Sequence, residues 1–182
     1  MNKTLEQYNS VIDACRDIFN SKLKDYGTSW RILRTPSVTD QIFIKAQRIR
    51  SIEEKGTQKI HDDIRSEYIG IINYCVIALI QLELGSSIEN ENLPEKQAHD
   101  LYEKYSSKAK SLMEDKNHDY GEAWRDMRIS SLTDIILMRI KRIKQIEDHA
   151  GKTFDSEGVD ANYLDMINYA VFALIKLMEI KK

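Results

Sequence analysis

A pattern of ten residues occurs twice in this chain and constrains its fold more than any other feature. The pattern is D-Y-G-x-x-W-R-x-x-R, and it begins at Asp25 and again at Asp119. Trp30 and Trp124, which are both tryptophans of the chain, occupy the same place in it. The constant offset of 94 residues, from Asp25 to Asp119, predicts two copies of one structural unit.

The composition favours helices in both copies. The chain has 182 residues, of which 42% are hydrophobic and 31% charged, with only two prolines and seven glycines. This balance is typical of a folded domain, and the scarcity of helix breakers favours helix. Apolar residues recur at helical spacing, which predicts helices at about 4–24, 37–55, 61–84, 95–117, 131–150 and 160–181. We therefore predict an all-α fold, in which two three-helix units pack as one helical bundle.

The two repeats account for nearly the whole chain. We place the first repeat at residues 1–84, a polar linker at 85–94 and the second repeat at 95–182. We expect Gly27 to end the first helix at positive φ and Pro36 to begin the next helix, and Gly121 marks the same corner in the second repeat. Because each repeat has about the length of half a fold that must dock on its twin to close a core, we expect both repeats to form one compact domain.

Several functional classes are disfavoured by the sequence. The net charge of −2 provides no general basic field for nucleic acid. The N-terminal residues lack an apolar signal segment, and the most apolar stretch, 68–84, is shorter than the roughly 20 residues of a membrane span. We therefore expect a cytoplasmic protein. Cys15 and Cys75 do not match between the copies and are interpreted as reduced core residues, and the histidines lack a metal-ligand spacing that would indicate zinc.

Polar residues interrupt the last, otherwise apolar, helix of each repeat. In the second repeat Asn162, Asp165 and Asn168 are spaced three apart and share one helix face. In the first repeat the same positions hold Glu67, Gly70 and Asn73. A buried polar stripe is costly unless its groups are paired or bind a ligand, so this face is a candidate site.

Carboxylates on neighbouring helices suggest a place for Mg²⁺, which prefers oxygen ligands and several waters. Our candidate ligands are Asp134, Glu147 and Asp165, with Asp119 nearby. Guanidinium groups suit phosphate oxygens, and the candidates are Arg125, Arg128, Arg139 and Arg142. The alternative is that these charges form a solvated face with ion pairs, and that both tryptophans only anchor the core.

The repeated motifs resemble those of a known family. D-Y-G-x-x-W-R, then T-D with a basic helix, then D-x-x-N-Y before an apolar segment is similar to the nucleotide modification associated domain of type 1. This resemblance covers both copies. The family is similar in turn to MazG-like nucleotide pyrophosphohydrolases, although their usual E-x-x-E element is not evident here. The resemblance implies an all-α fold and Mg²⁺-dependent cleavage of a nucleoside triphosphate to monophosphate and pyrophosphate.

The resemblance fits the second repeat better, because Gly70 replaces the acid of D-x-x-N-Y in the first. It implies that Asp119, Asp134 and Asp165 are the catalytic residues, with one carboxylate orienting or deprotonating water. The residues predicted to bind substrate are Arg125, Arg128, Arg139, Arg142, Asn168, Trp124, Glu67 and Asn73.

Two other functions stay open at this point. A non-catalytic nucleotide-binding or nucleotide-modification accessory protein would account for the missing E-x-x-E element and for Gly70. A helical scaffold would use the motif corners only for packing. The preferred base and sugar, and whether two chains form a homodimer, are not determined by the sequence.

Overall fold

The computed structural model describes residues 2–57, 59–60, 63–87, 89, 92–152 and 157–180. Within these residues the chain forms six α-helices, two short 3₁₀ turns and no strand. The elements are α1 (Asn2–Tyr26), η1 (Ser29–Ile32), α2 (Thr35–Lys55), α3 (Ile64–Leu84), α4 (Glu95–Tyr120), η2 (Ala123–Asp126), α5 (Ile129–Asp148) and α6 (Val159–Ile180). The all-α prediction is confirmed, although the predicted limits at His61 and Lys181 lie outside the described residues.

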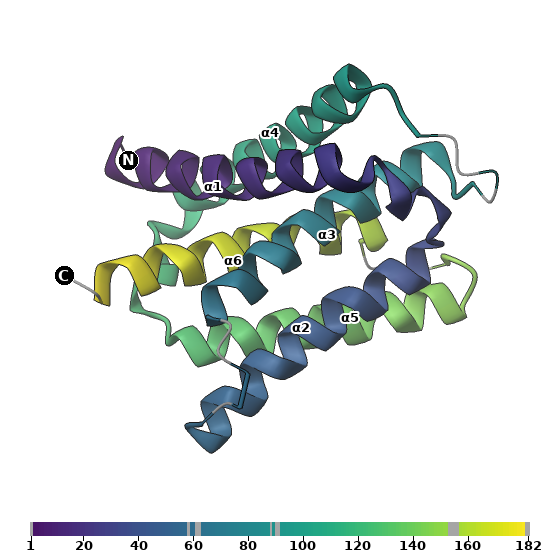
Figure 1. Cartoon of the computed structure of the whole chain (residues 1–182). Helices are drawn as coiled ribbons and strands as arrows, with labels where there is room; N and C mark the ends of the chain where they lie inside the picture. Colours follow the sequence, from purple (N-terminus) through teal and green to yellow (C-terminus); the bar gives the residue numbers. More distant parts are fainter. Residues whose placement is uncertain are drawn as a thin grey trace.

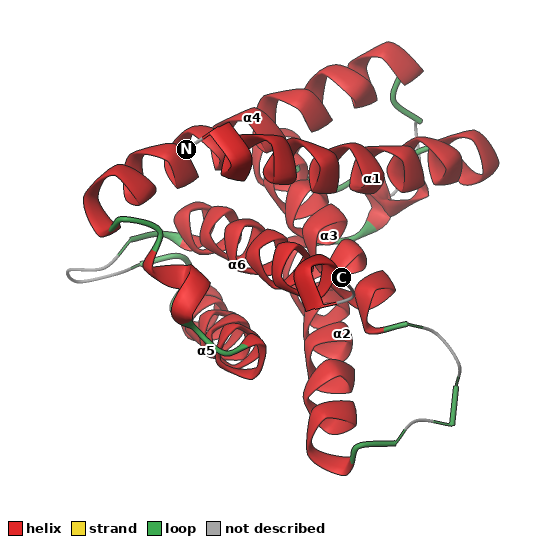
Figure 2. Cartoon of the chain, turned by 90° about the vertical axis from the view of Figure 1, so that its left-hand side faces the viewer, coloured by secondary structure: helices red, strands yellow, loops and turns green. Residues whose placement is uncertain are grey.

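The six helices are arranged in three pairs, each with one helix from each repeat (Figure 1). α3 and α6 form the central pair, α2 and α5 lie along one side of it, and α1 and α4 cover the other side. Figure 2 shows the same three levels after a quarter turn. The helices of each pair contact one another, so the repeats meet at every level.

α3 and α6 are buried because they are apolar on nearly all sides. By length and composition alone, α3 could cross a membrane. The prediction that the most apolar stretch is too short for a membrane span was therefore wrong. However, 67% of its most apolar window is buried inside the bundle, as expected of a core helix. Cys15 and Cys75 are buried and unpaired, as predicted, and burial raises the pKa of the Cys15 thiol to about 12.

The two motif corners have the predicted backbone. Gly27 and Gly121 both have φ +59°, a conformation that glycine adopts without a steric penalty, and each ends a long helix. A 3₁₀ turn then carries the tryptophan, and Pro36 stands in the first turn of the following helix. The first corner is held by the side chain of Gln81, which donates hydrogen bonds to the carbonyls of Trp30, Arg31 and Leu33.

Buried hydrogen bonds connect the two repeats, and in each a tyrosine of one repeat donates to an asparagine of the other. Asn73 donates to the Cys15 carbonyl of its own repeat at 3.0 Å and accepts a bond from the Tyr102 hydroxyl of the other repeat at 2.8 Å. The equivalent set, with the same two distances, is Asn168, Ala109 and Tyr8. The two repeats therefore interlock through an approximate two-fold relationship.

Candidate functional site

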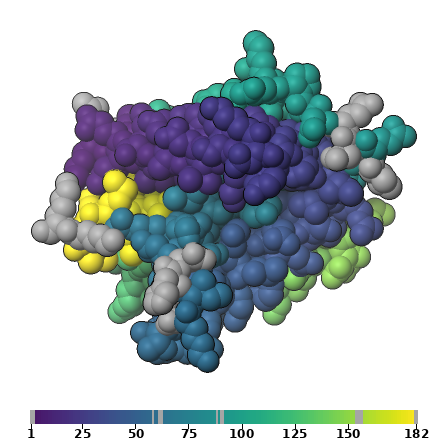
Figure 3. Space-filling view, in the orientation of Figure 1, coloured from purple at the N-terminus to yellow at the C-terminus, as the bar shows by residue number. Residues whose placement is uncertain are grey.

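A cavity of about 770 Å³ borders the motif corner of the first repeat. We call it the first-repeat cavity. Its walls come from the end of α1, from η1 and from α2 and α3, and Figure 3 shows these three helices on one face of the molecule. The lining residues that matter below are Lys22, Tyr26, Trp30, Lys45, Glu67 and Tyr74.

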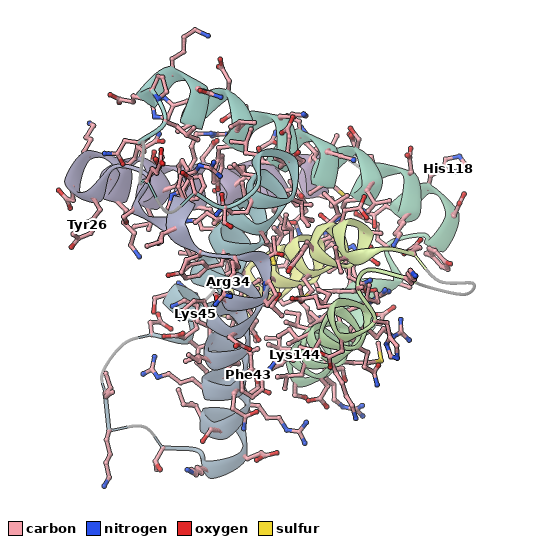
Figure 4. All side chains as sticks on the ribbon, turned by 90° about the vertical axis from the view of Figure 1, so that its right-hand side faces the viewer. Tyr26, Arg34, Phe43, Lys45, His118 and Lys144 are labelled. Carbon is pink, nitrogen blue, oxygen red and sulfur yellow. The ribbon has the colours of Figure 1, made fainter. Side chains whose placement is uncertain are left out.

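A smaller cavity of about 340 Å³, the second-repeat cavity, borders the other corner. Each of its twelve lining residues is equivalent to a residue that lines the first-repeat cavity. Figure 4 places the two corners far apart, with Tyr26 at the end of α1 on one side and His118 near the end of α4 on the other. Five of the six residues above have counterparts in this lining, namely Lys116, Tyr120, Trp124, Arg139 and Tyr169. The counterpart of Glu67 is Asn162, and Asp165, which also lines the second-repeat cavity, corresponds to Gly70. The protein therefore carries the same site twice, in two forms.

An aromatic side chain fills part of the second-repeat cavity. The Phe172 ring stacks on Trp124 with a centroid distance of 4.2 Å and an interplanar angle of 3°. The Arg125 guanidinium lies 4.4 Å from the centroid of the same indole ring. In the first repeat Ile77 stands in place of Phe172, and Trp30 stays partly exposed. The difference between a phenyl ring and an isoleucine thus contributes to the difference in volume.

Asp165, the main predicted catalytic acid, is held by two cations of its own repeat. Its carboxylate is only 4% exposed and lies 2.6 Å from the Lys116 ammonium and 3.0 Å from the Arg139 guanidinium. Arg139 also donates a hydrogen bond of 3.1 Å to Asn162. The polar stripe of α6 is therefore paired within the protein, which offsets part of the cost of burying it, although Asp165 Oδ2 and Arg139 Nε accept or donate no hydrogen bond among the described residues.

The first repeat distributes its charges differently. Gly70 replaces the acid, and the alkyl chain of Lys45 takes the space, since a Cβ atom on Gly70 would stand 2.6 Å from Lys45 Cδ. Glu67, one turn earlier, lies 2.6 Å from Arg48 and 3.7 Å from Lys45. Lys22, the counterpart of Lys116, pairs with no acid among the described residues. Lys45 therefore shares Glu67 with Arg48, whereas Lys22 keeps the charge that is neutralised on Lys116 in the second repeat.

The three predicted Mg²⁺ ligands do not come together. Asp134 is 60% exposed and lies 3.5 Å from Arg50, while Glu147 accepts a hydrogen bond of 3.0 Å from Thr39. Asp165 is enclosed by its two cations. Across the ranges that the structure describes, no three His, Cys, Asp or Glu side chains gather closely enough to hold a metal ion. The predicted ligand set therefore does not fit a Mg²⁺ ion.

Glu147 instead belongs to the contact between the repeats. The Thr39 hydroxyl bridges Glu147 and the Tyr163 hydroxyl, which is 2.6 Å away. The two-fold relationship between the repeats produces an equivalent bridge, in which the Thr133 hydroxyl contacts Glu53 and the Tyr68 hydroxyl. Burial raises the pKa of both Glu147 and Glu53. Nearby, the Lys144 ammonium lies 4.6 Å above the Phe43 ring, at the boundary of α2 and α5 in Figure 4.

The predicted phosphate-binding arginines are dispersed. Arg139 is the member of this group that lines the second-repeat cavity. Arg125 donates to Thr4 at 2.6 Å and to Gln7 at 3.0 Å, which ties its corner to α1. Arg128 and Arg142 are exposed, as is Asp119, whose carboxylate lies 3.1 Å from His118. These positions do not form one phosphate site.

Besides Arg139, four predicted substrate-binding residues line a cavity, namely Trp124, Asn168, Glu67 and Asn73. The amides of Asn73 and Asn168 are used to join the helices. Gly70 leaves the first repeat without the acid of its motif, and the sequence therefore favoured the second repeat. The prediction did not include four other lining residues, Lys22, Tyr26, Lys45 and Tyr74. The signal was present, since each of them has a polar or aromatic counterpart in the second repeat.

Comparisons with known proteins agree with the duplication. A family model described as nucleotide modification associated domain 1 matches residues 22–82 and 116–177, one segment in each repeat. No curated protein and no solved structure matches the chain. The predicted resemblance to this family is confirmed, whereas similarity to MazG-like enzymes has no support from these comparisons.

Proposed function

The chain belongs to the nucleotide modification associated domain 1 family, and we propose that it binds a nucleotide in the first-repeat cavity without hydrolysing it. The observation that carries the proposal is that one of two equivalent cavities is open and the other is partly filled. The volume of about 770 Å³ lies within the range of roughly 300–1,000 Å³ that is usual for small-molecule sites.

The aromatic lining supports recognition of a base. Trp30 is partly exposed to the cavity, and Tyr26 and Tyr74 contribute two further rings to its walls. Stacking of a base on an aromatic side chain contributes about 1–3 kcal/mol and tolerates different bases. In the second repeat the Trp124 face is already covered by Phe172, so we assign the ligand to the first.

Mg²⁺-dependent cleavage of a nucleoside triphosphate, which the family resemblance implied, has less support from the geometry. Such a reaction needs a carboxylate that can activate water or hold a metal. Asp165 is paired with Lys116 and Arg139, and Asp134 is exposed beside Arg50. We therefore favour the nucleotide-binding accessory function over the hydrolase.

The test is a panel of common nucleosides with their mono- and triphosphates, with and without Mg²⁺. Two quantities are measured on the same samples, the melting temperature and the release of pyrophosphate. We expect at least one nucleotide to raise the melting temperature without pyrophosphate release, because a ligand that binds only the folded state stabilises it. Pyrophosphate released in a Mg²⁺-dependent way would establish the hydrolase instead, and a panel without effect would favour the scaffold.

The location of the ligand is tested with a matched pair of variants. Tyr26 and Tyr120 are equivalent and are 68% and 73% exposed, so neither ring is needed for the core. We expect Tyr26→Ala to weaken nucleotide binding by about tenfold, in line with the loss of one stacking contact. Tyr120→Ala leaves binding unchanged in this proposal. Equal effects of the two substitutions would overturn the assignment to the first-repeat cavity.

A further inference from the structure

The position shared by Gly70 and Asp165 sets the charge of the two cavities. In the second repeat the Asp165 carboxylate lies between Lys116 and Arg139. In the first repeat the equivalent cations, Lys22 and Lys45, line the cavity without that carboxylate. Without a carboxylate at position 70, the two lysines keep positive charge that an external anion can offset.

Gly70 also determines where one of the cations can lie. The Lys45 Cδ and Cε atoms come within 2.6 Å of the place that a Cβ atom of residue 70 would take, and Nζ within 3.0 Å. Any side chain at this position would displace the lysine. A glycine in a helix interior costs about 1 kcal/mol relative to alanine, and in α3 it allows Lys45 to cross the helix surface into the cavity.

From this arrangement we propose that Lys22 and Lys45, which line the same cavity, form an anion subsite that takes the phosphate of a nucleoside monophosphate. The proposal rests on the nucleotide-binding function proposed above and deepens it. Glu67, the acid in the lining, lies 2.6 Å from Arg48 and 3.7 Å from Lys45, so Arg48 and the two lysines together exceed it by about two positive charges. A monophosphate ester, with a charge of about −2 near neutral pH, balances two lysines. A triphosphate carries more negative charge than these two groups offset.

The second repeat shows what kind of ligand fits this layout. There Phe172 places an aromatic ring on Trp124, while Asp165 places an anion between the two cations. The two residues are seven apart on α6, which corresponds to about 10 Å along the helix. In the first repeat Ile77 and Gly70 supply neither group. One molecule with a base, a sugar and a phosphate supplies both.

Lys22→Met tests the anion subsite, and Lys24→Met is the control, because Lys24 is exposed on the same helix and does not line the cavity. Calorimetry measures the affinity for the nucleoside, its monophosphate and its triphosphate, using the base that binds best in the panel. We expect the wild type to prefer the monophosphate. We expect Lys22→Met to weaken monophosphate binding about tenfold, the usual effect of losing one charged hydrogen bond, and nucleoside binding less than twofold.

Gly70→Asp is the second variant, since it places an acid where the second repeat has Asp165. We expect it to reduce the affinity for the monophosphate to that for the nucleoside. If neither nucleosides nor nucleotides bind the wild type, the proposed function is wrong. If they bind but Lys22→Met weakens nucleoside and monophosphate equally, only the anion subsite is wrong. Tighter binding of the triphosphate than of the monophosphate would overturn the monophosphate assignment.

Discussion

The Tyr102 hydroxyl donates a hydrogen bond of 2.8 Å to Asn73, so a residue of the second repeat completes a buried amide of the first. Tyr8 and Asn168 form the same bond in the opposite direction between the repeats. The sequence predicted both asparagines as substrate-binding residues because a polar stripe on a buried helix is costly. In the structure both amides are hydrogen-bonded within the protein, and the two tyrosine bonds join α1 and α4 to the central pair of helices (Figure 1).

Removing one of these hydroxyls is expected to destabilise the fold without altering its packing. Tyr102→Phe leaves the Asn73 oxygen buried without this donor, which typically costs about 1–3 kcal/mol. Tyr8→Phe should cost a similar amount because its bond is equivalent and also 2.8 Å long. Urea denaturation measures the free energy of unfolding for each variant and for the double variant. Unchanged stability in both single variants would show that the exchanged bonds do not hold the repeats together.

The helices could be predicted from the sequence because their signals are local. The spacing of apolar residues, and glycines such as Gly27 and Gly121 at the ends of long helices, act within a few residues of the chain. The repeated motif then predicted the duplication. None of these signals depends on how distant side chains meet, so the six helices begin and end within three residues of the predicted bounds.

The open cavity could not be predicted in this way, since it depends on contacts between helices. Asp165 looked like a functional acid, but its partners Lys116 and Arg139 come from α4 and α5. Gly70 looked like a lost acid, although it makes room for Lys45 of α2. An alignment of the two repeats shows which residues differ, but only packing shows which difference fills a cavity.

The corner that carries Trp30 is expected to depend on Gln81. Its amide donates to three carbonyls of the corner, and its oxygen accepts a bond from Arg31, which is only 7% exposed. Gln81→Leu leaves these buried groups unpaired, and we expect a loss of about 2–4 kcal/mol in the free energy of unfolding.

Lys176→Met is the matched control for Gln81→Leu, because Lys176 makes a single bond to the carbonyl of Arg125 at the second corner. It should cost about 0.5–1.5 kcal/mol, the usual contribution of one hydrogen bond. Both values follow from denaturant titrations. Equal losses in the two variants would contradict a special role of Gln81.

Gly70→Ala is expected to separate stability from binding. Alanine is favoured over glycine inside a helix by about 1 kcal/mol, and the clash with Lys45 involves the flexible end of that side chain. We therefore expect a modest rise in melting temperature together with weaker binding of a monophosphate. Gly85→Ala is the contrasting variant, since φ +76° at this position should make alanine destabilising. A Gly70→Ala protein with unchanged ligand affinity would contradict the role assigned to Lys45.

The contact between α2 and α5 should make stability depend on pH through Glu147. Burial raises the pKa of this carboxyl in the folded state, so its contribution is most favourable in acid and is lost as the pH rises through that pKa. Glu147→Gln stays neutral and keeps an oxygen that can accept the bond from Thr39. We expect this variant to be more stable than the wild type at neutral pH, with an advantage that disappears in acid. Denaturant titrations at several pH values measure this difference, with the exposed Glu54→Gln as control. A Glu147→Gln protein less stable than the wild type at neutral pH would show that the charged carboxylate stabilises the contact.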